Sequence, residues 1–256
     1  MDTTLKTHLL QEVKKKKECA TLPDTLIEES IAQVLKRYPS VKSDNVYQLK
    51  VLIKEIRANL HRSTGMFQKG STEKKRKHLK STDIESLLKT HLSTAERLKT
   101  YSTLKEKIKS WKIRSIIDLG CGLNPLALAS QDTSYRAYDI RKDEVDLLND
   151  FFKREGISGK AEVYDIRKFN NDLPEADLCL IWKVLDIIGG DSHHLTKRLL
   201  QGMTCNLFLI SFPTQTLSGK RMHHKRRIWL ERLLKEEKYS YETFELANEI
   251  FYLVNN

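Results

Sequence analysis

The chain has 256 residues, of which 39% are hydrophobic and 31% charged, with a formal net charge of +11. This composition allows a packed core under a heavily charged surface, and no apolar run approaches the ~20 residues of a membrane-spanning helix. Residues 1–80 hold 18 Lys and Arg against 9 Asp and Glu, whereas residues 81–256 hold 27 against 25. The positive excess therefore lies in the N-terminal third. This is typical of a region that binds a polyanion such as nucleic acid, and a solvated basic helical surface is the alternative.

The cysteines and histidines argue against a metal site or a disulfide framework. The four cysteines are scattered without a Cys-x-x-Cys pair, and the pairs His193-His194 and His223-His224 lack helical ligand spacing. The first residues contain no apolar signal region. We therefore expect a reduced, metal-free, cytoplasmic protein that is not bound to a membrane.

Residues 1–110 are predicted to be helical and basic. One amphipathic stripe runs from Ile27 to Leu35 and stops at Tyr38-Pro39, and a second runs from Val46 to Ile56. Residues 63–80 are predicted to be a loop or a basic helix, and residues 81–83 offer N-caps for the helix that follows. We interpret residues 1–110 as a nucleic-acid-binding domain, and the family resemblance described below implies that the nucleic acid is RNA. Its candidate RNA contacts are the basic run Lys74, Lys75, Arg76 and Lys77.

The pattern changes near Ser115 to alternating strands and helices. The expected strands are 115–119, 135–140, 161–165, 177–182, 205–211, 240–246 and 249–254, and the expected helices are 124–131, 142–155, 193–202 and 224–237. Five strands separated by helices predict a parallel sheet, and the last two strands predict a hairpin. Residues 111–256 are therefore expected to form an α/β domain with a Rossmann-like seven-stranded sheet, the architecture of class I S-adenosylmethionine-dependent methyltransferases.

A glycine turn follows the first expected strand. The strand ends at Asp118, the turn contains Gly120 and Gly122, and Pro125 suits the first position of the next helix. Asp139 ends the second strand, where an acid can accept hydrogen bonds from both ribose hydroxyls. This arrangement predicts a nucleotide cofactor, and an ordinary strand-to-helix turn is the alternative.

The turn does not complete the dinucleotide-binding fingerprint. Leu123, Asn124 and Pro125 follow Gly122, so the third glycine, which allows close helix packing beneath a pyrophosphate, is missing. A wide turn preceded by an acid is better suited to S-adenosylmethionine, which has an adenosine but no phosphate.

Further candidate residues follow the other strands, because ligands of such sheets bind at the carboxyl ends of the strands. Asp165 could accept from the adenine amino group, and Ile140 and Ile166 could hold the ring between them. Lys183 could orient a methionine carboxylate or the target base. The alternatives are an acid in a surface turn for Asp165 and a lysine reaching toward solvent for Lys183.

Five segments in order resemble one known family. They are His-x-Ser-Thr-x-Glu-Arg (91–97), Asp-Leu-Gly-Cys-Gly-Leu-Asn-Pro-Leu-Ala-Leu (118–128), Tyr-Asp-Ile (138–140), Ile-Ser-Phe-Pro (210–213) and Leu-Ser-Gly-Lys (217–220). From about Leu87 onward the chain resembles the Arm/Rmt methyltransferases of 16S ribosomal RNA that confer aminoglycoside resistance. The basic N-terminal half cannot be aligned with them by eye.

The resemblance implies methylation of guanosine N7 in the decoding-site helix of 16S rRNA within the 30S subunit. We expect the enzyme to be a monomer. It implies that Arg97 binds the methionine carboxylate and that Gly120, Gly122, Asp139, Asp165 and Ile166 hold the rest of the cofactor. Asp118 and Ile140, at the ends of the first two strands, complete the expected cofactor residues. The segment 213–227, which includes Lys220, Arg221 and Arg226, would meet the RNA.

The expected chemistry requires no general base, because guanine N7 has a lone pair and no proton. Orientation supplies much of the acceleration in such a transfer. Trp182, Lys183 and Phe212 are candidates to position the base, although either aromatic ring could instead belong to the core. Two alternatives remain at this point: methylation at another rRNA position such as adenosine N1, and a non-catalytic ribosome assembly factor.

Overall fold

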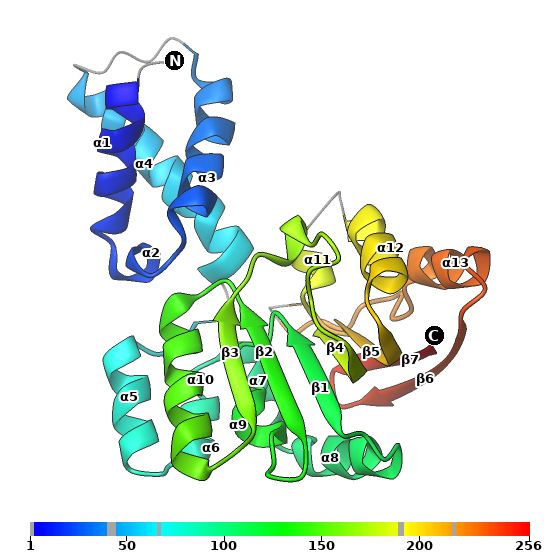
Figure 1. Ribbon diagram of the computed structural model, residues 1–256. Coiled ribbons are helices and arrows are strands. Elements are labelled where there is room, and N and C mark those ends of the chain that lie inside the picture. The colour runs from blue at the N-terminus through cyan, green and yellow to red at the C-terminus, as the bar shows by residue number, and fades with distance from the viewer. Residues whose placement is uncertain (1–2, 40–44, 66–67, 189–191, 217–218) are drawn as a thin grey trace. The chain divides into compact units, whose positions relative to one another are not determined.

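The structure, a computed structural model, describes residues 3–39, 45–65, 68–188, 192–216 and 219–256 (Figure 1). It divides into two compact units: residues 1–68 with 140–143, and residues 69–139 with 144–256. The described part of the expected helical region 1–110 contains helices α1 to α8, and residues 69–110 belong to the second unit. None of the described helices combines the length and apolar character needed to cross a membrane.

The first unit is a small helical assembly. Its helices are α1 (Thr3–Lys14), α2 (Lys17–Ala20), α3 (Asp24–Arg37), α4 (Val46–Leu60) and the turn η1 (His61–Gly65). Asn45 caps α4 by accepting a hydrogen bond from the Gln48 N–H at 3.0 Å. The predicted stripe on α3, from Ile27 to Leu35, is buried in this unit's core, which confirms the amphipathic pattern.

Four residues from the middle of the chain also belong to this unit. Ile140 packs against its apolar core. The Thr21 hydroxyl donates to Asp143 at 2.8 Å, and the Arg141 guanidinium donates to the Glu18 carbonyl at 3.3 Å. The chain therefore leaves the first unit at residue 68 and returns to it for residues 140–143.

The second unit holds the sheet. Its strands are β1 (Ser115–Leu119), β2 (Ser134–Asp139), β3 (Gly159–Val163), β4 (Ala176–Trp182), β5 (Cys205–Pro213), β6 (Ser240–Leu246) and β7 (Glu249–Asn255). Its helices are α5 (Thr72–Lys80), α6 (Ile84–Leu88), α7 (Leu92–Arg97), α8 (Tyr101–Ser110), α9 (Pro125–Leu128), α10 (Lys142–Glu155, whose first two residues belong to the first unit), η2 (Ile166–Lys168), α11 (Leu185–Ile188), α12 (Ser192–Gly202) and α13 (Ile228–Glu236). Every predicted strand is present.

The strand order is β3-β2-β1-β4-β5-β7-β6. Strands β1 to β5 are parallel, and β7 is antiparallel to both β5 and β6. The order reverses between β1 and β4, so the crevice for a ligand lies at the carboxyl ends of these two strands. This topology confirms the predicted Rossmann-like seven-stranded sheet with five parallel strands and a terminal hairpin.

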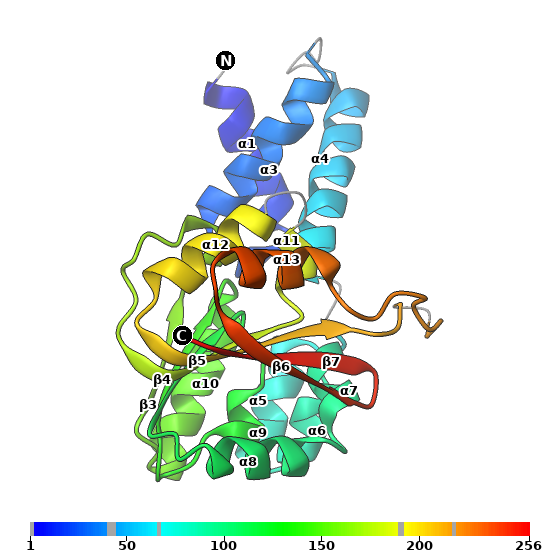
Figure 2. The ribbon, with the colours of Figure 1, turned by 90° about the vertical axis from the view of Figure 1, so that its right-hand side faces the viewer.

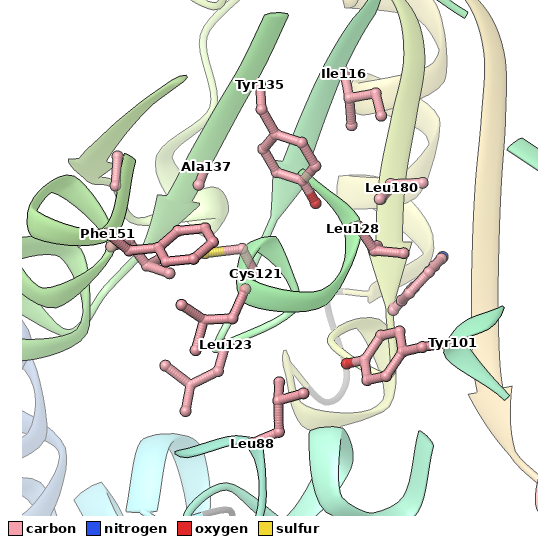
Figure 3. Close-up of a cluster of buried hydrophobic side chains, with 14 of the residues drawn as sticks. Leu88, Tyr101, Ile116, Cys121, Leu123, Leu128, Tyr135, Ala137, Phe151 and Leu180 are labelled. Atoms are coloured by element: carbon pink, nitrogen blue, oxygen red, sulfur yellow. The ribbon is translucent and has the colours of Figure 1, made fainter. Parts of the chain in front are cut away.

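Apolar side chains cover both faces of the sheet. One cluster joins the sheet to α8, α9 and α10, and the other joins it to α12 and α13 (Figure 2). In the first cluster, Cys121 and Leu123 from the glycine turn lie among Leu88, Tyr135 and Phe151 (Figure 3). The turn therefore rests on the packed core.

Candidate functional site

The glycine turn after β1 is hydrogen-bonded to the end of β2. The N–H groups of Gly120 and Cys121 both donate to the Tyr138 carbonyl, at 2.8 and 3.1 Å. The Gly122 N–H donates to Asp139 Oδ2 at 2.9 Å. Gly120 (φ 65°) and Gly122 (φ 50°) adopt left-handed conformations that favour glycine. The turn and the Asp139 carboxylate, predicted separately, thus form one rigid corner.

Two side chains approach these glycines closely. A Cβ at Gly120 would lie 2.8 Å from Val184 Cγ2, and a Cβ at Gly122 would lie 3.1 Å from His91 Nε2. His91 begins the segment 91–97 that carries part of the resemblance. The structure therefore brings this upstream segment to the glycine turn, which local sequence patterns could not show.

Asp118 lies fully buried at the carboxyl end of β1. Its Oδ2 accepts from the Tyr135 hydroxyl at 2.7 Å, whereas its Oδ1 has no hydrogen-bond partner among the described residues. Burial raises the pKa of Asp118 to about 7, against the smaller opposing effects of Tyr135, Asn124 and Arg97. No hydrogen bond reaches Asp118 Oδ1 within the described part of the chain, although the nearby Asn124 side chain stabilises the charged carboxylate.

Arg97 makes a bidentate ion pair that its predicted role did not anticipate. Its Nε donates to Glu249 Oε2 at 2.8 Å, and a terminal nitrogen donates to Glu249 Oε1 at 2.7 Å. The other terminal nitrogen donates to Asn124 at 3.1 Å, and the guanidinium lies 4.9 Å from the Trp182 ring centroid. The fork expected to bind a methionine carboxylate is therefore occupied by Glu249 in this structure.

Glu249 also connects Arg97 to Lys183. The Lys183 ammonium lies 2.7 Å from Glu96 Oε2 and 3.3 Å from Glu249 Oε2. Although burial raises the pKa of Glu249, the charges of Arg97 and Lys183 together lower it below its usual value. Lys183 has a φ of 57°, a conformation uncommon for a residue with a side chain and frequent at functional sites. Glu249, at the start of β7, is the member of this cluster that sequence reasoning missed.

The two aromatic candidates for base stacking are core residues in this structure. Phe212 is 0% exposed and packs edge-to-face against Trp229 and Tyr252. Trp182 is 3% exposed and packs edge-to-face against Phe251. Neither ring offers a face to an incoming base, so stacking by these two residues is corrected to a packing role.

The three residues predicted to contact adenine, Asp165, Ile166 and Ile140, have different surroundings in the structure. Asp165 caps η2, and both of its oxygens face the Arg167 guanidinium, at 2.8 and 2.5 Å. Ile166 is buried against the sheet. Ile140 packs on the core of the first unit. Asp165 is thus engaged by a neighbouring cation in this structure.

The basic candidates divide into buried and exposed side chains. Lys75 is 2% exposed, and its ammonium lies 2.5 Å from Glu144 on α10. A lysine buried in this way cannot reach a phosphate, so its predicted RNA contact is wrong. Lys74, Arg76 and Lys77 are exposed.

The expected RNA segment after β5 is also exposed. Lys220 and Arg221 are exposed, and so is Arg226, which pairs with Glu231. Leu217 and Ser218, part of the resemblance, lie outside the described residues.

Comparison with known proteins assigns the chain to a family. The profile described as ribosomal RNA methyltransferase (FmrO) matches residues 48–253. The chain belongs to the FmrO family of ribosomal RNA methyltransferases. The match includes the glycine turn, Asp118, Asp139 and the ion-pair cluster, so the fold is that of a class I methyltransferase, as predicted.

Individual relatives agree with this assignment. A Serratia marcescens protein named 16S rRNA (guanine(1405)-N(7))-methyltransferase is 29% identical over 180 residues, which cover 69% of this chain and 71% of the relative. A Frankia casuarinae protein of the same name is 26% identical, over 67% of this chain and 63% of that protein. The crystal structure of the 16S rRNA methyltransferase RmtF with S-adenosyl-L-homocysteine has a TM-score of 0.85 and 25% identity, and covers 100% of this chain and 99% of that one.

Proposed function

We propose that this FmrO-family protein transfers the methyl group of S-adenosylmethionine to N7 of a guanosine in the decoding-site helix of 16S rRNA, and so confers aminoglycoside resistance. The family match over residues 48–253 carries this proposal, together with relatives named for guanine-N7 methylation. We further propose that the protein acts in the cytoplasm as a monomer on the 30S subunit, and that residues 1–110 contribute the RNA-binding region.

The glycine corner fits the proposed cofactor. The left-handed glycines allow the backbone to approach a ligand, and Asp139 is fixed beside them by the Gly122 N–H. The orphaned Asp118 Oδ1 is a buried acceptor at the same strand ends. When bound, S-adenosylmethionine supplies a methyl group on a sulfonium as the electrophile.

The residues of this chain then orient the reactants. Guanine N7 attacks with its own lone pair, so no side chain needs to accept a proton. We assign Asp139 to the ribose hydroxyls, and Arg97 and Lys183 to a positioning role through Glu249. Holding the two reactants in line is the main contribution of such a site to the rate.

Loss of Asp139 is expected to weaken cofactor binding. In Asp139→Ala the ribose loses a charged acceptor whose hydrogen bonds contribute about 1.5–3 kcal/mol, so the dissociation constant should rise about 10- to 150-fold. Calorimetry with S-adenosylhomocysteine measures this change. Asp132→Ala, an exposed acid in the loop before β2, is the matched control and should bind like the wild type. If the wild type and both variants bind S-adenosylhomocysteine with equal affinity, Asp139 does not contact the cofactor.

The position of the methyl group tests the proposed reaction. The wild-type protein is incubated with unmodified 30S subunits and S-adenosylmethionine, and the RNA is treated with borohydride and aniline. N7 methylation makes the guanine ring cationic, so we expect strand cleavage at one guanosine of the decoding-site helix. Methylation at adenosine alone would refute the proposed specificity, and RNA without any modification would refute the activity.

The exposed charges on α5 are expected to contribute to RNA affinity. Replacing Lys74, Arg76 and Lys77 together by alanine should lower the slope of log affinity against log salt by about 2–3, at roughly 0.7–0.9 per lost phosphate contact. Lys112, Lys153 and Lys160, which are exposed and lie outside residues 1–110, form a control triple with the same charge change and should keep the wild-type slope. If both triple variants show the wild-type slope, α5 is only a solvated basic surface.

A further inference from the structure

Residues 219–227, between β5 and α13, form a basic segment without a single acid. They contain Lys220, Arg221, Lys225, Arg226 and Arg227. Three of these cations have carboxylate partners on other elements, at 2.5–2.7 Å. Lys220 and Arg221 are exposed and make no ion pair within the described part of the chain. The segment therefore holds two cations available to a polyanion.

A stacked pair of rings lies beside this segment. The His193 imidazole of α12 and the Trp229 indole of α13 have centroids 4.3 Å apart and planes inclined by 14°. Trp229 in turn packs edge-to-face on the buried Phe212, with centroids 5.9 Å apart. His193 is the exposed member of the pair, and the neighbouring Ile228 is 57% exposed. The exposed His193 ring is therefore supported from below by Trp229, which itself rests on the core residue Phe212.

Arg227 joins the basic segment to the same ring cluster. Its guanidinium lies 4.9 Å from the Phe212 centroid and 2.7 Å from the Asp186 carboxylate. Its backbone N–H donates to the Tyr252 hydroxyl at 2.7 Å. These contacts hold the residue immediately before α13, and with it the position of Trp229.

The pair is at the ligand-binding edge of the sheet. Helix α12 begins after the carboxyl end of β4, and α13 begins after the carboxyl end of β5. Both helices lie on the same face of the sheet (Figure 2). Their first residues, including His193 and Trp229, therefore lie at the edge where parallel α/β sheets bind their ligands.

We propose that the His193–Trp229 pair is a stacking platform for an unpaired nucleotide of the RNA substrate, and that Lys220 and Arg221 bind phosphates of the same RNA. The proposal rests on the proposed function and adds a contact outside the cofactor site. Proteins bind unpaired RNA bases by stacking them on aromatic side chains, histidine included, beside a positively charged surface. Packing of Trp229 on the buried Phe212 holds the stacked pair in place before any base binds. The basic segment 219–227 contains no acid, which favours RNA over a protein partner.

The test compares two adjacent histidines of α12. His193→Ala should weaken binding to unmodified 30S subunits about 5- to 150-fold, the range for loss of one stacked base, with an unchanged salt slope. His193→Tyr keeps a flat ring and should retain most of the affinity. His194→Ala is the matched control, since His194 is also exposed, and it should bind like the wild type. Lys220→Ala with Arg221→Ala should instead lower the salt slope by about 1.5.

Two results of the binding measurements would overturn the platform. One is wild-type affinity of His193→Ala, and the other is equal losses in His193→Ala and His194→Ala. Cross-linking from p-benzoylphenylalanine at position 193 identifies the occupant, which we expect to be 16S rRNA; a cross-link to ribosomal protein alone would also overturn the proposal. Guanosine methylation by the wild-type protein is measured in parallel, so failure of the proposed function is seen separately from failure of the platform.

Discussion

Replacing Glu249 by alanine is expected to lower the free energy of unfolding by about 3–5 kcal/mol, because it leaves two buried cations without their shared anion. Arg97 is 3% exposed and loses both bonds of its bidentate pair, and Lys183 loses one of its two carboxylates. The Ser211 hydroxyl loses its acceptor as well. Few single substitutions outside the apolar core should destabilise this unit as much.

Urea denaturation followed by tryptophan fluorescence measures this effect. Trp111, Trp182 and Trp229 all belong to the second unit, so the signal follows the unit that contains Glu249. Glu245→Ala is the control on the neighbouring strand. Glu245 forms an exposed pair with Lys225 at 2.7 Å, and its loss should change the unfolding free energy by less than about 1 kcal/mol. If Glu249→Ala and Glu245→Ala have equal free energies of unfolding, the ion pairs of Glu249 with Arg97 and Lys183 do not stabilise the fold as buried pairs.

Asp118→Asn is expected to change how the stability depends on pH. The folded-state pKa of Asp118 is about 7, whereas an aspartate in an unfolded chain has a pKa of about 3.9. Between these values the folded protein binds a proton that the unfolded chain has released. The contribution of Asp118 to the free energy of unfolding of the wild type therefore falls as the pH rises from about 4 to 7, by up to about 1.4 kcal/mol per pH unit.

The asparagine variant has no proton to lose, so it should become progressively more stable relative to the wild type across that range. The amide oxygen introduced at position 118 can still accept from the Tyr135 hydroxyl. Urea denaturation of both proteins at pH 5 and pH 8 measures the difference, in which the titration of all other groups cancels. A difference that stays constant between the two pH values would mean that Asp118 is already ionised in the fold at pH 5.

The strands were predictable because their residues repeat a local pattern. The runs 115–119 and 240–246 have the expected bounds, and the other five strands differ from expectation by at most two residues at either end. The helix expected at 124–131 is shorter, since α9 ends at Leu128. Glycine spacing and the acid at the end of β2 were likewise local signals, and the structure joins them in one corner through the hydrogen bond from Gly122 to Asp139.

The charge cluster could not be predicted in the same way. Arg97 and Glu249 are separated by 152 positions, and nothing near Glu249 in the sequence distinguishes it from an acid at the start of an exposed strand. Lys75 lies in a run of four cations, which indicates a basic surface. Its burial depends on Glu144, 69 positions away. Long-range pairing decides the role of these residues.

The first unit is not formed by the N-terminal residues alone, so residues 1–68 cannot be exchanged between proteins without affecting a later part of the chain. Residues 140–143 belong to this unit, although they directly follow Asp139 of the glycine corner. A homologue that exchanged residues 1–68 for an unrelated helical region would leave Ile140 without its apolar neighbours and Asp143 without the Thr21 hydroxyl. We therefore expect substitutions in the N-terminal helices to be accompanied, among relatives, by substitutions at residues 140–143.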